Sequence, residues 1–420
     1  MLQVASYNIG YRLLEKKVIT MSQTRALIMG TLAGLALTSL SPLAFAAADD
    51  IEREFDVQPG GHVDLRSDAG AVDVNTWDEN RVRVRVRNTT GFDVEVEQNG
   101  NEILITADSE RNGFFNFRGS SIGFALDVPR KYNLSIDTGG GHIEIADITG
   151  AINADTSGGH IEIGNVLRGP VRADTLGGRI SILDVEGDVE VDTSGGSITV
   201  GNVIGSVNAD TSGGRITIGN VSGDIYADTS GGNIEVGEGG GRVVLDTSGG
   251  SIRAGWAMGP LSADTSGGNI TLAGSASRIE ADTSGGNITI DGSGGPIDAD
   301  TSGGSIRIRG ATGPVRADTA GGRIDVDLGD VNGSIGGSVD LETAGGDVTV
   351  RIPTTLGVTI NANLEVSRRS RGDYRIYTDF PLTIQEDDDV ILGRGDINGG
   401  GDRISLRTRN SDIHIVRIGN

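Results

Sequence analysis

The chain has 420 residues, of which 68 are glycine, nine are proline and none is cysteine, and its formal net charge at pH 7 is −23. The lack of cysteine excludes disulfide frameworks, thiolate zinc sites and lipid-modified cysteines. The negative charge excludes a nucleic-acid partner, because phosphate binding needs a basic face. Glycine does not recur every third residue, which excludes collagen, and the aliphatic content is too high for simple disorder.

Residues 1–46 contain an upstream extension, 1–20, followed by a segment from Met21 to Ala46 with the pattern of a secretory signal peptide. Arg25 directly precedes the apolar stretch Ala26–Leu40, which is too short to span a membrane, and a small-x-small cleavage site ends at Ala46. We expect translation to start at Met21 and cleavage to occur before Ala47. The mature protein is then expected in the periplasm, at the outer membrane or outside the cell, with no transmembrane span. A retained N-terminal anchor is the alternative.

Residues 47–135 are rich in expected strands but lack the repeat that follows. Arg81–Arg87 alternate arginine with valine, which is typical of a strand with one buried face. We expect the arginines to face solvent or to pair with Asp93, Glu95 and Glu97 on the next strand.

The motif Asp-Thr-Ser-Gly-Gly, with close variants, dominates residues 136–350. After one interval of nineteen residues, the regular copies follow at intervals of eighteen, and irregular copies begin at Asp137 and Glu342. The regular copies begin at Asp155, Asp174, Asp192, Asp210, Asp228, Asp246, Asp264, Asp282, Asp300 and Asp318.

Each eighteen-residue unit contains two short strand patterns of period two, as in Val207-Asn208-Ala209 and Ile216-Thr217-Ile218. We expect the Gly-Gly pairs to supply turn positions of positive φ. A lone strand this short is unstable, whereas stacked rungs pair each backbone with the rungs on either side. The sequence therefore predicts an all-β fold, a parallel β-solenoid (β-helix) of 18-residue rungs with two short strands each, about 50 Å long.

Residues 351–420 return to irregular strand patterns. Solenoids need atypical ends that prevent edge-to-edge growth. We therefore expect 47–135 and 351–420 to be β-rich capping modules on either side of a repeat domain at 136–350.

The ten aspartates would form one column, in which carboxylates about 4.8 Å apart repel by roughly 0.9 kcal/mol per neighbouring pair even in bulk water. One explanation is that each carboxylate accepts hydrogen bonds from its own Ser-Gly-Gly turn. The other is that divalent cations such as Ca²⁺ bind along the column, which makes these aspartates candidate metal ligands. Ten stacked copies do not fit the paired aspartates of an aspartic protease.

The four histidines do not show the spacing of metal ligands in the sequence. His142 and His160 nevertheless occupy equivalent positions in successive rungs, so they either hold a metal ion together or form a coincidental polar pair. The outward positions of both strands are mixed, without a threonine lattice or an aromatic ladder. We expect no catalytic residues and no organic cofactor.

Several motifs are similar to those of the bacterial putative-adhesin family of β-strand-repeat proteins, which is a family of unknown function. They are Phe55–Gly61, Val72–Trp77, Val128-Pro129, the Asp-Thr-Ser-Gly-Gly-x-Ile-x-Ile repeats, Tyr377–Leu382 and Gly399–Gly401. The resemblance implies an envelope-associated β-solenoid with an adhesive role, linked in some relatives to envelope-stress responses. It supplies no catalytic residues.

The sequence thus favours a non-enzymatic, exported cell-envelope protein that acts as an adhesin or a binding scaffold for a surface protein or polysaccharide. Two alternatives are a cation-binding extracellular matrix protein and a polysaccharide-active β-helix enzyme. The enzyme would need a cleft built on long inserted loops, and rungs of constant length leave little room for them.

Overall fold

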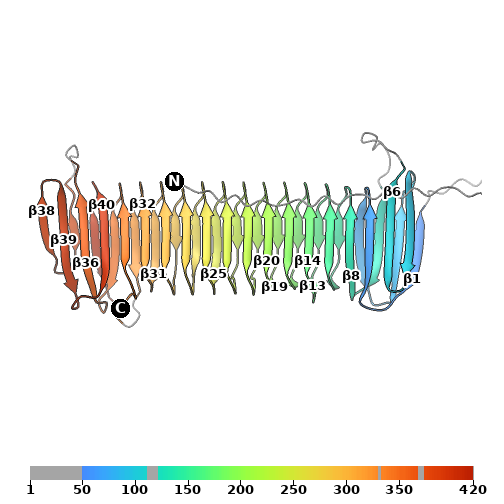
Figure 1. Ribbon diagram of the computed structural model, residues 1–420, viewed down its shortest axis with the longest axis horizontal. Helices are drawn as coiled ribbons and strands as arrows, with labels where there is room; N and C mark the ends of the chain where they lie inside the picture. The colour runs from blue at the N-terminus through green and yellow to red at the C-terminus, as the bar shows by residue number, and fades with distance from the viewer. Residues whose placement is uncertain (1–49, 111–121, 330–332, 368–372, 420) are drawn as a thin grey trace, which may run out of the picture. The chain divides into compact units, whose positions relative to one another are not determined.

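The computed structural model describes residues 50–110, 122–329, 333–367 and 373–419. Contacts divide the chain into two units, Met1–Phe45 and Ala46–Asn420, and all described residues belong to the second. The predicted leader and cleavage site lie outside the described residues. Every named element of the described ranges is a β-strand (Figure 1). A search of these residues finds no helix that could cross a membrane.

Two parallel ladders of strands form the repeat region, and together they confirm the predicted solenoid (Figure 1). We call the first the aspartate sheet, because its strands end in the Asp-Thr pair of the motif, or in Glu-Thr at the last one. Its successive strands are β8 (Tyr132–Thr138), β11 (Ile152–Thr156), β14 (Val171–Thr175), β17 (Val189–Thr193), β20 (Val207–Thr211), β22 (Ile225–Thr229), β24 (Val243–Thr247), β26 (Leu261–Thr265), β28 (Ile279–Thr283), β30 (Ile297–Thr301), β32 (Val315–Thr319) and β34 (Val339–Thr343).

We call the second ladder the isoleucine sheet. Its successive strands are β9 (Ile143–Ile145), β12 (Ile161–Ile163), β15 (Ile180–Ile182), β18 (Ile198–Val200), β21 (Ile216–Ile218), β23 (Ile234–Val236), β25 (Ile252–Ala257), β27 (Ile270–Ser275), β29 (Ile288–Ile290), β31 (Ile306–Ala311), β33 (Ile324–Leu328) and β35 (Val348–Pro353). In both sheets the strand residues pair with their equivalents one rung away, as Ile198 does with Ile216, except for one register shift between β31 and β33 after Ile308.

A third, shorter ladder completes the early rungs and was not anticipated from the sequence. It comprises β10 (Ile148–Thr149), β13 (Val166–Leu167), β16 (Val185–Glu186) and β19 (Val203–Ile204). Isolated bridges continue the same line, for example from Val203 to Val221 and from Val221 to Gly239.

The core is a thin column of aliphatic side chains between the sheets. Ile216 and Ile218 of one sheet, and Val207 and Ala209 of the other, are each no more than 2% exposed. Alternation along the strands leaves the intervening side chains outside, as period-two strands with one buried face require. These aliphatic side chains provide the main stabilisation of each rung.

Threonine and glycine close the corner after the aspartate strand. Thr211 is buried, and its Oγ1 donates a hydrogen bond to the Gly196 carbonyl of the preceding rung at 2.9 Å and accepts one from the Gly214 N–H at 3.3 Å. Gly214 has no positive φ; instead, a Cβ there would lie 1.8 Å from the Gly196 oxygen. The expectation that the Gly-Gly pairs supply positive φ was therefore wrong at this corner, where close backbone approach requires the glycine.

At the N-terminal end the two sheets continue beyond the repeats, but with rungs out of chain order. The strands are β1 (Ile51–Asp56), β2 (Gly61–Ser67), β3 (Ala71–Trp77), β4 (Arg81–Arg87), β5 (Phe92–Asn99), β6 (Glu102–Ser109) and β7 (Gly123–Pro129). The β2–β3 rung pairs in parallel with β8–β9 on one side and with the later β6–β7 rung on the other. Antiparallel strands then end each sheet. In one sheet β5 pairs with β6, and in the other β4 pairs with β7 and β1 pairs with β4.

The C-terminal end is built in the same way, with one rung out of chain order and antiparallel strands at the edge. Its strands are β36 (Val358–Glu365), β37 (Ile376–Thr378), β38 (Thr383–Asp387), β39 (Val390–Ile397), β40 (Asp402–Arg409) and β41 (Ile413–Ile418). The last rung, β40–β41, lies between β34–β35 and β36–β37. Antiparallel β39 and β38 then cover the edge of the aspartate sheet.

The arginines of β4 do not pair with β5 as expected, because β5 joins the other sheet. β4 lies between β1 and β7, and its arginines pair with carboxylates there. Arg83 Nε lies 2.7 Å from Glu54 Oε1, and Arg85 Nη2 lies 2.8 Å from Asp127 Oδ2.

Candidate functional site: the carboxylate ladder and two neighbouring clusters

The ten aspartates of the regular motif are brought together in one row on the outer surface of the aspartate sheet. Each is the register partner of the next, from Asp155 with Asp174 to Asp300 with Asp318. Asp137 precedes the row and Glu342 follows it in the same register. We call this row the carboxylate ladder.

An arginine lies in register with each of the two carboxylates that flank the carboxylate ladder. Arg66 of β2 is the partner of Asp137, and Arg407 of β40 is the partner of Glu342, whose Oε2 lies 3.3 Å from Arg407 Nη1. The out-of-order end rungs place these two arginines, so the row of like charges ends beside a positive charge on each side.

The threonine of the motif, and not the aspartate, accepts the hydrogen bond from the backbone N–H of the turn. Across the described residues, the ten ladder carboxylates make no hydrogen bond and no ion pair, whereas the adjacent threonines bind the turn amide and the previous rung, as Thr247 does. The explanation that each aspartate accepts hydrogen bonds from its own turn was therefore wrong. Alternation along the strand points Thr247 inward and Asp246 outward.

Partial burial and repulsion along the row raise the pKa of several ladder carboxyls. Burial is the larger cause and the neighbouring aspartates add to it, and the pKa is raised at Asp155, Asp174, Asp210, Asp228, Asp264 and Asp318. The pKa of Asp282 is raised to about 6, with contributions from Asp264 and Asp300 after burial. Because neighbouring carboxylates repel, protonation of one member changes the affinity of the next for protons.

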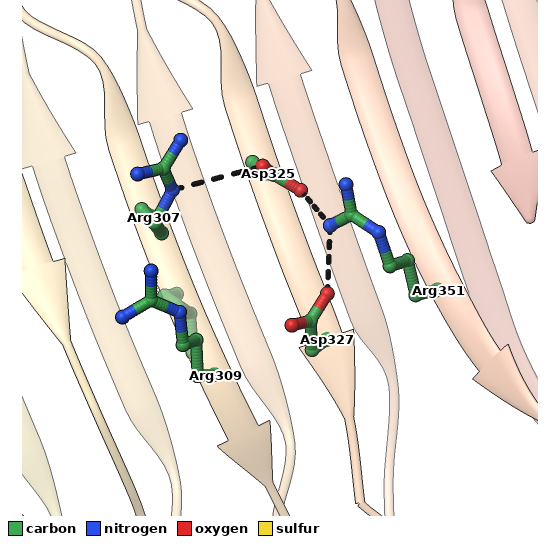
Figure 2. A pocket seen from close by; sticks show the side chains of 6 residues that line it. Arg307, Arg309, Asp325, Asp327 and Arg351 are labelled. Carbon is green, nitrogen blue, oxygen red and sulfur yellow. Dashed lines mark hydrogen bonds and ion pairs between the residues drawn. The ribbon is translucent and has the colours of Figure 1, made fainter. Parts of the chain in front are cut away.

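A second cluster lies on the outer face of the isoleucine sheet near its C-terminal end (Figure 2). Arg351 binds both Asp325 and Asp327, with 2.7 Å between its Nη1 and Asp327 Oδ1, and Arg307 Nε lies 3.7 Å from Asp325 Oδ2. With Arg309 these side chains line a pocket of about 310 Å³. Arg309 Nη1 in turn lies 2.8 Å from Asp291 Oδ1, so each of the three guanidinium groups has a carboxylate partner and the cluster carries no excess of positive charge.

The histidines divide into a pair and two separate residues. His142 and His160 stack with ring centroids 5.2 Å apart, as their equivalent positions suggested. His414 stacks on Tyr377 at 4.9 Å, and His62 lies on β2. The sequence reasoning missed the carboxylates beside the pair, although the repeated string His-Ile-Glu-Ile at 142–145 and 160–163 signals them.

Comparison with proteins of curated function gives no match. A putative adhesin from Bacteroides fragilis is similar at 16% identity and a TM-score of 0.35, over 54% of this chain and 98% of that one. A putative cell adhesion protein from Clostridium sporogenes gives 9% identity and a TM-score of 0.16, over 88% and 100% of the two chains. A putative lipid binding protein from Parabacteroides distasonis gives 16% identity and a TM-score of 0.19, over 68% of this chain and 98% of that one.

The family comparison agrees with the motifs of the repeat and of the N-terminal strands. Residues 62–254 match the family model described as Toastrack DUF4097, a span that runs from β2 into β25. This match agrees with the resemblance of these residues to the putative-adhesin family of unknown function.

Proposed function

We propose that the protein is an exported, non-enzymatic scaffold of the cell envelope that binds a repetitive surface partner through its carboxylate ladder. The observation that carries this proposal is the register of the ladder, in which identical carboxylates recur on successive strands and have no hydrogen-bond or ion-pair partner among the described residues. Such a row favours many weak contacts, which gain strength when a repetitive polymer engages several at once. The family match and the leader expected at 21–46 support a place in the envelope.

The chemistry of the ladder limits the partner to groups that neutralise carboxylates. These are cationic groups repeated along a protein or polysaccharide, or divalent cations that connect the ladder to an anionic polymer. The cation route is the second candidate function, that of a cation-binding matrix protein. Its specific support is that, within the described ranges, no turn donates a hydrogen bond to a ladder carboxylate.

Cell fractionation and a binding assay with whole cells test the proposal. We expect the protein in the envelope or outside the cell, and we expect cells that lack the gene to bind the purified protein. The ladder variant carries Asp192→Asn, Asp228→Asn and Asp264→Asn and should bind less. A cytoplasmic location would contradict the export, and equal binding by the ladder variant would contradict the role of the ladder.

A control variant separates the ladder from net charge. It neutralises three exposed carboxylates of β5 through Asp93→Asn, Glu95→Gln and Glu97→Gln. Because both variants lose three negative charges, only a ladder-specific contact makes their binding differ. A binding loss of equal size in both would show that bulk charge, and not the ladder, attracts the partner.

A further inference from the structure

A mixed cluster of imidazole and carboxylate groups lies on the outer face of the isoleucine sheet, apart from the carboxylate ladder. Glu144 is the outward residue of β9 and Glu162 is its register partner on β12. His160 immediately precedes β12, and its carbonyl accepts the N–H of Ile143 at 2.9 Å. The parallel register thus fixes the relative positions of the three backbones.

The ligand atoms of these three residues converge. One atom each from Glu144, His160 and Glu162 lies within 4.8 Å of the others, and His160 Nε2 is 3.9 Å from Glu144 Oε1. The side chains are half-exposed, which allows small rotations to bring their donors closer. A pocket of about 360 Å³ borders both glutamates.

We propose that Glu144, His160 and Glu162 bind one divalent transition-metal ion of the zinc class. One imidazole nitrogen and two carboxylate oxygens are ligands that Zn²⁺ accepts at about 2.0–2.2 Å, with water in the fourth position. The imidazole distinguishes the cluster from the ladder, because Ca²⁺ and Mg²⁺ prefer oxygen ligands alone. The repeated His-Ile-Glu-Ile string supplies this donor set, since each strand turns its glutamate to the outside.

Two neighbouring pairs affect the cluster. His142 stacks on His160, and its Nε2 lies 3.4 Å from Asp73 Oδ1, so this pair borders the site on the side of β3. Arg179 forms an ion pair with Glu162 and therefore competes with a metal ion for that carboxylate. Removal of the arginine should release Glu162 and strengthen metal binding.

Titration calorimetry of the purified protein with Zn²⁺ tests the proposal, in a buffer with excess Ca²⁺ that occupies sites made of carboxylates alone. We expect one Zn²⁺ per chain. His160→Asn should weaken binding by more than the roughly 10- to 100-fold that loss of an outer-shell partner produces. Glu162→Gln should weaken it in the same direction. The visible spectrum of the Co²⁺-substituted protein should show four-coordinate metal.

Two further variants protect the test against misfolding and non-specific binding. Arg179→Gln should bind Zn²⁺ more tightly, a gain that a damaged fold cannot produce. His414→Gln removes a histidine that stacks on Tyr377 and should leave binding unchanged. No Zn²⁺ binding in the presence of Ca²⁺, or equal binding by His160→Asn and the unaltered protein, would overturn the proposal.

Discussion

The two glycines of one motif should respond very differently to the same substitution. A Cβ at Gly214 would lie 1.8 Å from the Gly196 carbonyl oxygen, whereas a Cβ at Gly213 would come no closer than 3.6 Å to any neighbour, the nearest being the Gly195 oxygen. Gly214→Ala therefore forces adjacent rungs apart, while Gly213→Ala adds an ordinary contact.

The size of the effect follows from the contacts at the corner. Relief of the clash requires a backbone shift, and overpacking of this kind costs about 1–3 kcal/mol. The Gly196 oxygen that must move also accepts the hydrogen bond of Thr211 at 2.9 Å, which adds about 1 kcal/mol if it is lost. We expect Gly214→Ala to destabilise its rung by about 2–4 kcal/mol and Gly213→Ala to change its stability by less than about 1 kcal/mol.

Hydrogen exchange resolved by peptide is the suitable assay, because repeat arrays open locally and a single global free energy is not well defined. A loss of 2–4 kcal/mol corresponds to a decrease in protection of about 30- to 900-fold. It should be confined to peptides from the rungs around 196–232. Equal protection in the Gly214→Ala and Gly213→Ala proteins would refute the close-approach argument.

Three other predictions concern the corner and the ladder. Thr211→Val removes both hydrogen bonds of its hydroxyl and should destabilise the rung by about 1–3 kcal/mol, while Thr211→Ser should lose less; hydrogen exchange measures both. Because the folded state raises the pKa of Asp282 to about 6, its ionised form opposes folding above pH 6, and this effect disappears as the pH falls from about 6 to about 4. Conversion of this pKa shift into free energy gives about 3 kcal/mol, which solvent screening of the half-exposed carboxylate reduces to about 1 kcal/mol. Asp282→Asn should therefore raise the midpoint of urea unfolding at pH 7.5 but not at pH 4. Glu97→Gln, which removes an exposed carboxylate elsewhere, is the control. CaCl₂ should raise the melting temperature more than NaCl at equal ionic strength, and a chelator should reverse the excess; equal shifts would show screening alone.

The regular part of the fold was predictable because its signals are local. Eighteen-residue spacing and period-two strands, such as Ile216-Thr217-Ile218, determine the stacking and the side of each residue. The third ladder was missed because a two-residue strand such as Val203–Ile204 has one buried residue and shows no alternation. The out-of-order end rungs were missed because they depend on pairings between strands far apart in the chain, such as β34 with β40.

The roles of individual corner residues were only partly predictable. Alternation from Val207 through Ala209 already places Thr211 inward and Asp210 outward, so the sequence held the signal that threonine, and not aspartate, binds the turn. The sequence alone does not show why position 214 is glycine, because a positive φ and a close approach of two backbones both require glycine. The metal cluster needed the register of β9 on β12, which brings Glu144 beside Glu162.

The ladder is tolerated by the fold and not required by it. Each rung buries aliphatic side chains such as Ile198, Val200 and Val207, and full burial of one contributes about 1.5–3 kcal/mol. This exceeds a repulsion of roughly 0.9 kcal/mol per neighbouring carboxylate pair, so the stack forms in spite of the row of charges. Asparagine at Asp210 would keep the shape of the strand and remove the repulsion.

The contrast between two outward positions of the same strand therefore bears on function. The position two residues before each ladder aspartate varies freely, with Arg172, Glu190, Asn208, Tyr226 and Val244 in successive rungs. The ladder position is aspartate in all ten regular copies, although the carboxylate forms no hydrogen bond in the described structure and opposes folding where its pKa is raised. Packing explains neither the uniformity nor the charge. The partner that we propose, which contacts the carboxylates of many rungs at once, would account for both, because its affinity depends on an unbroken row.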